Sequence, residues 1–87
     1  MNYDLIEKFI ETTKRKNKNV NIHFKTRGTI TGVFITETGD YREMKNKNFW
    51  RIVPDSRMEE WKKTKDLSLS RLFNGAEFTR LSDDQAI

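Results

Sequence analysis

The sequence contains no cysteine, one histidine and one proline among its 87 residues. Without cysteine there is no disulfide, no thiolate zinc site and no thiol nucleophile. A single histidine offers little for a metal centre or for acid–base catalysis. No apolar run approaches the roughly 18 residues that span a bilayer, and the start of the chain lacks the apolar stretch of a secretory signal. We therefore expect a cytoplasmic protein that uses no metal or cofactor and does not enter a membrane.

Signatures of catalysis are also missing. There is no glycine-rich phosphate loop, no GxSxG elbow and no convincing Ser–His–Asp set in the sequence. Glu59 and Glu60 are neighbours at the start of an expected helix, so their carboxylates point in different directions and form no catalytic pair. A chain of 87 residues also has room for only one small core. We do not expect an enzyme.

The residues that are present indicate a folded, sheet-rich protein. Ten aromatic residues and a net charge of only +4 distinguish the chain from typical disordered segments, although 34% of its residues are charged. Only two alanines occur, against nineteen β-branched Val, Ile and Thr residues. This balance favours strands over a helical bundle.

Hydrophobic periodicity predicts a single domain over residues 1–87. Residues 3–16 have apolar side chains at helical spacing, with Leu5, Ile6, Phe9, Ile10 and Thr13 on one stripe. Alternation predicts strands over residues 20–25, 29–36, 49–53, 67–73 and 78–81. A short helix is expected near residues 56–64, and residues 82–87 are expected to form a frayed tail. Residues 41–48 look polar and irregular.

Details of the pattern sharpen this prediction. Gly32 within the second strand indicates a bend or a close backbone approach. Ser56 and Glu59 have the spacing of a capping box. The strands over 29–36 and 49–53 are apolar on both faces, so each needs a helix or a partner as well as a core. Because five short strands in an open sheet would leave exposed edges and a thin core, we expect a small, strongly bent antiparallel barrel with an N-terminal helix and a short helical insertion.

This layout resembles the Sm-like (Lsm) family and, more broadly, SH3-like barrels. Val20, Ile22 and Phe24 alternate as in the first Sm motif, Gly32 follows Phe24 by eight residues, and the turn glycine Gly28 is one place late. Residues 73–81 (FNGAEFTRL) have the spacing of the second motif. The resemblance implies an RNA-binding fold in which Asn74 and Gly75 would form part of a base pocket.

The sequence departs from the family pattern at the residues that would form that pocket. Asn74 stands where the family has arginine. The family's Asp-x-x-Met-Asn loop is matched only loosely, because Asp40 and Met44 are four positions apart and the nearest asparagine is Asn46. Similarity of fold does not by itself transfer function.

The charge of the chain is concentrated in one segment. Residues 12–36 contain no acid and six basic residues, which are Lys14, Arg15, Lys16, Lys18, Lys25 and Arg27. A continuous cationic face of this kind would bind the phosphates of RNA or single-stranded nucleic acid without reading sequence. The alternative is a solvated helix end whose cations neutralise the helix dipole.

Other candidates have a functional and a structural interpretation. Tyr41, Phe49, Trp50 and Trp61 lie among basic residues, as in single-strand binding surfaces, but aromatic residues also fill small cores. His23 is expected to point outward and to be incidental. The alternative function is a protein-interaction or self-assembly module, possible because two strands are apolar on both faces.

Overall fold

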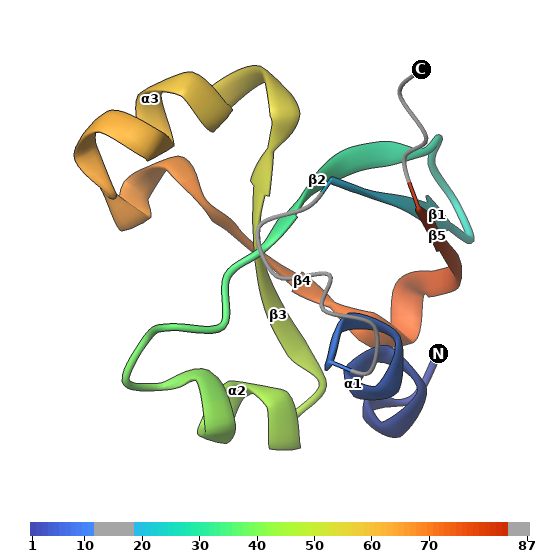
Figure 1. The fold of residues 1–87 in the computed structure, drawn as a ribbon. Helices are drawn as coiled ribbons and strands as arrows, with labels where there is room; N and C mark the ends of the chain where they lie inside the picture. The colour runs from blue at the N-terminus through green and yellow to red at the C-terminus, as the bar shows by residue number, and fades with distance from the viewer. Residues whose placement is uncertain (12–18, 84–87) are drawn as a thin grey trace.

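Five antiparallel strands form the centre of the computed structural model, which describes residues 1–11 and 19–83. Neighbouring strands follow the order β4-β3-β2-β1-β5 (Figure 1). Their bounds are β1 Val20–Phe24, β2 Ile30–Phe34, β3 Phe49–Pro54, β4 Arg71–Asn74 and β5 Phe78–Asp83. The helices are α1 Tyr3–Glu11, α2 Tyr41–Asn46 and α3 Met58–Thr64, and the 3-10 turns are η1 Asp55–Arg57, η2 Leu67–Leu69 and η3 Gly75–Glu77. The five-stranded antiparallel sheet and the N-terminal helix are confirmed.

The strand β1 is central to the part of the sheet that carries the candidate site. It pairs with β2 on one side, where Ile22 lies opposite Ile30, and with β5 on the other, where His23 lies opposite Arg80. Alternation buries Val20 and Ile22 and leaves Asn21 and His23 partly exposed. The apolar–polar pattern of the sequence therefore sets which side chains of β1 face solvent.

The sheet is strongly curled but is not closed by hydrogen bonds. A flat sheet would place β4 about 14 Å from β1, at roughly 4.8 Å per strand spacing. Yet the rings of Phe24 on β1 and Phe73 on β4 have centroids 5.5 Å apart. The sheet must therefore bend back on itself, while β4 and β5 remain its two edges.

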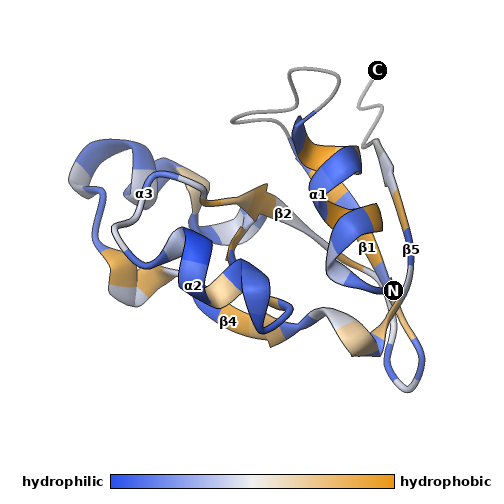
Figure 2. Ribbon diagram, turned by 90° about the horizontal axis from the view of Figure 1, so that it is seen from below, coloured by the Kyte–Doolittle hydropathy of each residue, from blue (hydrophilic) through white to orange (hydrophobic). Residues whose placement is uncertain are grey.

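The inner face of the sheet packs against α1. Ile6 and Ile10 are buried on this helix, and they join a core cluster with Val20, Ile22, Phe34, Trp50, Ile52, Phe78 and Leu81. Figure 2 shows apolar residues along one side of α1. The predicted helix extended to residue 16, and residues 12–16 lie outside the described part. Leu5 was placed on the apolar stripe, but it is 54% exposed, so that assignment is wrong.

A second core cluster covers the opposite apolar face of β2 and β3. Val33, Ile35 and Val53 pack there with Trp61 of α3, and Met58 and Leu69 add to the cluster. The chain itself therefore covers both apolar faces of these strands. Gly32 has the close backbone approach that the sequence predicts, since a Cβ atom there would lie 2.6 Å from the Val53 carbonyl oxygen.

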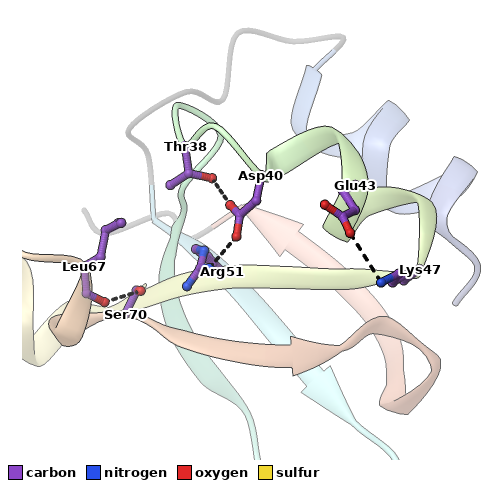
Figure 3. Close-up of polar contacts among 7 residues, drawn as sticks. All are labelled: Thr38, Asp40, Glu43, Lys47, Arg51, Leu67 and Ser70. Carbon is purple, nitrogen blue, oxygen red and sulfur yellow. Dashed lines mark hydrogen bonds and ion pairs between the residues drawn. The ribbon is translucent and has the colours of Figure 1, made fainter.

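The segment predicted to be irregular, residues 41–48, contains the helix α2. The sequence pattern did not predict this helix because its side chains bond to neighbouring elements and do not form a buried apolar stripe. The Tyr41 hydroxyl donates to Glu11 Oε2 over 2.7 Å, and Lys45 forms an ion pair with Glu7 of α1. At the start of α2, Asp40 accepts hydrogen bonds from Thr38 (2.7 Å) and Arg51 (2.6 Å), as Figure 3 shows. Tertiary contacts thus stabilise a helix that has no sequence periodicity.

Three other boundaries differ from the sequence prediction. The capping box is wrong: η1 precedes α3, and Arg57 occupies the N-cap of α3 with no side-chain hydrogen bond. The strand expected over 67–73 begins only at Arg71, because residues Leu67–Leu69 form η2, capped by the Asp66 carboxylate. β5 continues to Asp83, beyond the predicted start of the tail, and residues 84–87 lie outside the described part. Within residues 1–11 and 19–83, no helix has the length and apolar character needed to cross a bilayer.

Candidate nucleic-acid interface

The outer face of β1 and β5 carries a hydrogen-bonded group centred on His23. Its Nδ1 atom lies 3.0 Å from Thr29 Oγ1, and its Nε2 atom lies 3.4 Å from both Ser82 Oγ and Arg80 Nη2. A guanidinium has only donors, so a hydrogen bond between Arg80 and His23 requires Nε2 to be the acceptor. His23 and Arg80 lie opposite each other where β1 pairs with β5, and the network holds the imidazole and the guanidinium side by side.

Lys25 and Arg27 extend this group along the chain to the β1–β2 turn. The Lys25 amide donates to the Glu77 carbonyl over 2.9 Å, which fixes the end of β1 to η3. The Arg27 guanidinium lies 5.2 Å from the ring centroid of half-buried Phe24, a cation–π contact. Phe24 in turn packs against Phe78 at 5.2 Å. The turn therefore presents a cation beside a partly accessible aromatic ring.

We name His23, Lys25, Arg27 and Arg80 the β1–β5 cationic surface. Within the described residues, none of its three cations makes an ion pair. Among the described cations elsewhere, Lys45, Lys47, Arg51 and Arg57 have carboxylate partners, whereas Arg42, Lys62, Lys63, Lys65 and Arg71 have none. Arg80 lies on β5, Lys25 and Arg27 lie in the turn after β1, and positive charge that no carboxylate offsets favours binding of an anion.

The Met1 ammonium group interacts electrostatically with Lys25 of this surface. It donates to the Phe78 carbonyl (2.7 Å) and to the Gly75 carbonyl (3.1 Å). Its pKa lies below the ordinary value of 8.0, first because burial disfavours the charge and second because Lys25 repels it. The charges of Met1 and Lys25 therefore lie close enough to interact.

The structure places four of the sequence-predicted site residues, in two locations. Lys25 and Arg27 lie in the turn after β1, where the Lys25 amide bonds to Glu77 and the Arg27 guanidinium packs on Phe24. Asn74 and Gly75 lie at the start of η3, where the exposed Asn74 accepts a hydrogen bond from the Ala76 amide and Gly75 is buried. The remaining four, Lys14, Arg15, Lys16 and Lys18, lie outside the described residues.

The aromatic candidates occupy the core rather than a surface. Trp50 and Trp61 are 2% and 7% exposed, and Tyr41 and Phe49 are half-buried. Trp50 packs edge-on against both Phe34 and Tyr41. The structural interpretation of these residues therefore fits the geometry better than a stacking surface does.

Sequence reasoning missed Arg80, Thr29 and Ser82 as members of the site. Alternation along β5 places Arg80 on the face opposite to buried Leu81, which was a usable signal. The pairing of Arg80 with His23 was not readable, because it depends on the register of two strands 57 positions apart.

Comparison of the chain with protein-family models, with curated proteins and with solved structures finds no match. The Sm-like resemblance therefore stays a prediction.

Proposed function

We propose that this protein binds the phosphate backbone of RNA or single-stranded nucleic acid through the β1–β5 cationic surface. The observation that carries the proposal is the absence of any ion pair for Lys25, Arg27 and Arg80 within the described residues. Cations in that state release counterions when they bind phosphates, which provides affinity without sequence readout.

The surroundings of these cations suit a single strand. Hydroxyl groups of Thr29 and Ser82 lie in the same network and can donate to phosphate oxygens. Lys25 directly follows the end of β1 and is two positions after His23, so the two side chains can follow an extended nucleic-acid backbone.

The proposal includes a bent barrel of Sm-like or SH3-like type in a cytoplasmic protein. The curl that brings Phe24 to Phe73 supports such a barrel, although hydrogen-bonded closure would also require contact between β4 and β5. We include Lys14, Arg15, Lys16 and Lys18 as an extension of the binding face, since they precede β1 in the chain and add four positive charges.

The self-assembly alternative receives less support from the packing. It was suggested by strands that are apolar on both faces, and Met58, Trp61 and Leu69 of the same chain cover the second face. Among the described residues, both faces of these strands are already packed and do not require a second chain. We therefore place nucleic-acid binding first.

Fluorescence anisotropy with mixed-sequence single-stranded oligonucleotides tests the proposal. We expect micromolar affinity that weakens as salt rises from about 50 to 200 mM. The double variant Lys25→Gln/Arg80→Gln should weaken binding about tenfold and reduce the log–log salt slope by about 1.4, or 0.7 for each lost phosphate contact. Arg27 is left in place because it also covers Phe24.

The matched control is Lys62→Gln/Lys63→Gln, which removes the same charge from exposed positions of α3. It should retain close to wild-type affinity and slope. Equal losses in the two double variants would mean that only net charge matters, and wild-type protein that shows no salt-sensitive binding would refute the function.

A further inference from the structure

The β1–β5 cationic surface contains the single histidine of the chain, His23. Histidine is the residue type that ordinarily changes charge between pH 5 and 8. A neutral imidazole has one donor nitrogen and one acceptor nitrogen, whereas both nitrogens of the protonated ring are donors. The hydrogen bonds that His23 can form therefore depend on its charge.

The two hydroxyl partners of His23 suit both charge states of the ring. Thr29 Oγ1 lies 3.0 Å from Nδ1, and Ser82 Oγ lies 3.4 Å from Nε2. A hydroxyl can donate to a ring nitrogen or accept from it, because its hydrogen rotates to suit. The imidazole can therefore stay in place between Thr29 and β5 when it gains a proton.

The Arg80 contact suits only the neutral ring. Arg80 Nη2 lies 3.4 Å from His23 Nε2, where the two residues are opposite each other on β1 and β5. A guanidinium cannot accept a hydrogen bond, so a protonated Nε2 loses this contact and brings a second positive charge beside the first. The like charges repel each other, and an anion that bridges them removes the repulsion.

We propose that His23 couples nucleic-acid binding to pH: the protonated ring and Arg80 together hold one phosphate of the strand, and affinity rises as pH falls. This inference rests on the proposed function and adds the regulation of the same surface. The coupling is reciprocal, because a bound phosphate favours the protonated ring by the same factor as protonation favours the phosphate.

The strands on either side of β1 differ in the charge that they bring to His23. β2 contains no titratable residue. On β5, Arg80 lies opposite His23, and Asp83 lies opposite Val20 at the other end of β1. Arg80 is therefore the charged group whose contact changes when the ring gains a proton.

Further charged groups lie where β1 ends. Lys25 and Arg27 are in the turn after it, and the Glu77 carbonyl accepts from the Lys25 amide. Side chains of these types ordinarily keep their charge between pH 5.5 and 7.5. The Met1 ammonium, in contrast, has a pKa below its ordinary value of 8.0 and interacts with Lys25, so it also gains charge as pH falls. A variant that lacks only the imidazole separates the two effects.

Fluorescence anisotropy with an oligothymidylate tests the proposal, because thymine bases do not titrate between pH 5.5 and 7.5. At constant salt, we expect wild-type protein to bind about fivefold more tightly at pH 5.5 than at pH 7.5. The log–log salt slope should be steeper at pH 5.5 by up to about 0.7, for one added phosphate contact. His23→Gln retains Met1 and a polar side chain, and it should lose most of this pH dependence.

Proton NMR of the imidazole C–H signal gives an independent measurement on the wild-type chain. The midpoint of its pH titration should rise by at least about 0.7 pH unit at saturating oligothymidylate, the logarithm of the fivefold change. The inference is overturned, with the proposed function intact, if salt-sensitive binding is equally strong at both pH values, if His23→Gln keeps the full pH dependence, or if the oligonucleotide leaves the titration unchanged. Absence of salt-sensitive binding at both pH values would refute the proposed function as well.

Discussion

Asn48 connects four segments of the chain at one position. Its side chain accepts from the Trp50 indole (2.9 Å) and donates to the Met1 carbonyl (3.0 Å). Its carbonyl accepts from the Gly75 amide over 2.7 Å, and its amide donates to Lys45. The residue has a φ of 64°, a left-handed value that asparagine tolerates better than other non-glycine residues. Conformation and hydrogen bonding therefore both favour asparagine here.

Asn48→Ala should lower the free energy of unfolding by about 2–4 kcal/mol, since it leaves the Trp50 donor unpaired and imposes left-handed strain. Asn48→Gly loses the same hydrogen bonds without the strain, so its loss should be smaller by about 1 kcal/mol. Urea unfolding followed by tryptophan fluorescence measures both. An alanine variant as stable as the glycine variant would show that backbone strain contributes nothing at this position.

At the residue scale, two of the four residues of the β1–β5 cationic surface could be predicted from the sequence. Lys25 and Arg27 follow directly from an acid-free stretch of sequence. Arg80 could not be joined to them, because strand register is a long-range property that local pattern does not contain. The same limit hid the role of Asn48, because its partners Met1 and Gly75 are far from it in the sequence.

At the scale of elements, α2 shows how tertiary contacts create a helix that local pattern does not predict. It buries no residue, and it is held to α1 by Tyr41 and Lys45 and to β3 through the Asp40–Arg51 pair (Figure 3). The strands, by contrast, follow from alternation, because their side chains meet a core on fixed faces.

The Asp40–Arg51 pair makes the stability of this element dependent on pH. Hydrogen bonds from Arg51 and then Thr38 hold the pKa of Asp40 below its ordinary value of 3.8. A carboxyl group whose pKa is lower in the folded state stabilises the fold above its unfolded pKa, and this contribution is lost as pH falls through the folded pKa.

Asp40→Asn should therefore be less stable than wild type at pH 7, and the difference should shrink as pH falls below about 4. Thermal unfolding at a series of pH values measures it. The control is Glu43→Gln, which removes the exposed i,i+4 pair with Lys47 and should change stability little at any pH. A constant difference for Asp40→Asn across the acid range would contradict this account.

At the scale of the whole molecule, one curled sheet carries two core clusters and a candidate nucleic-acid interface. The inner cluster lies under α1, and the second lies under α3 and η2. The β1–β5 cationic surface lies near the start of β2, and a cavity lined by residues 34–39, Trp61, Lys65 and Leu67 (the Trp61 cavity) lies beyond its end. The hydrophobic pattern predicted the sheet and the covering helix, but it could not predict the cavity, which is formed by segments brought together from either side of β3.

The most direct test of the central claim is a map of backbone amide shifts in proton–nitrogen NMR spectra when a single-stranded oligonucleotide is added. The account predicts that, among residues 1–11 and 19–83, the largest shifts fall on His23, Lys25, Arg27 and Arg80 and disappear when salt is raised. The same spectra would show whether Lys14, Arg15, Lys16 and Lys18 take part. Shifts confined to α3 and the Trp61 cavity, or none at all, would contradict nucleic-acid binding by the β1–β5 cationic surface.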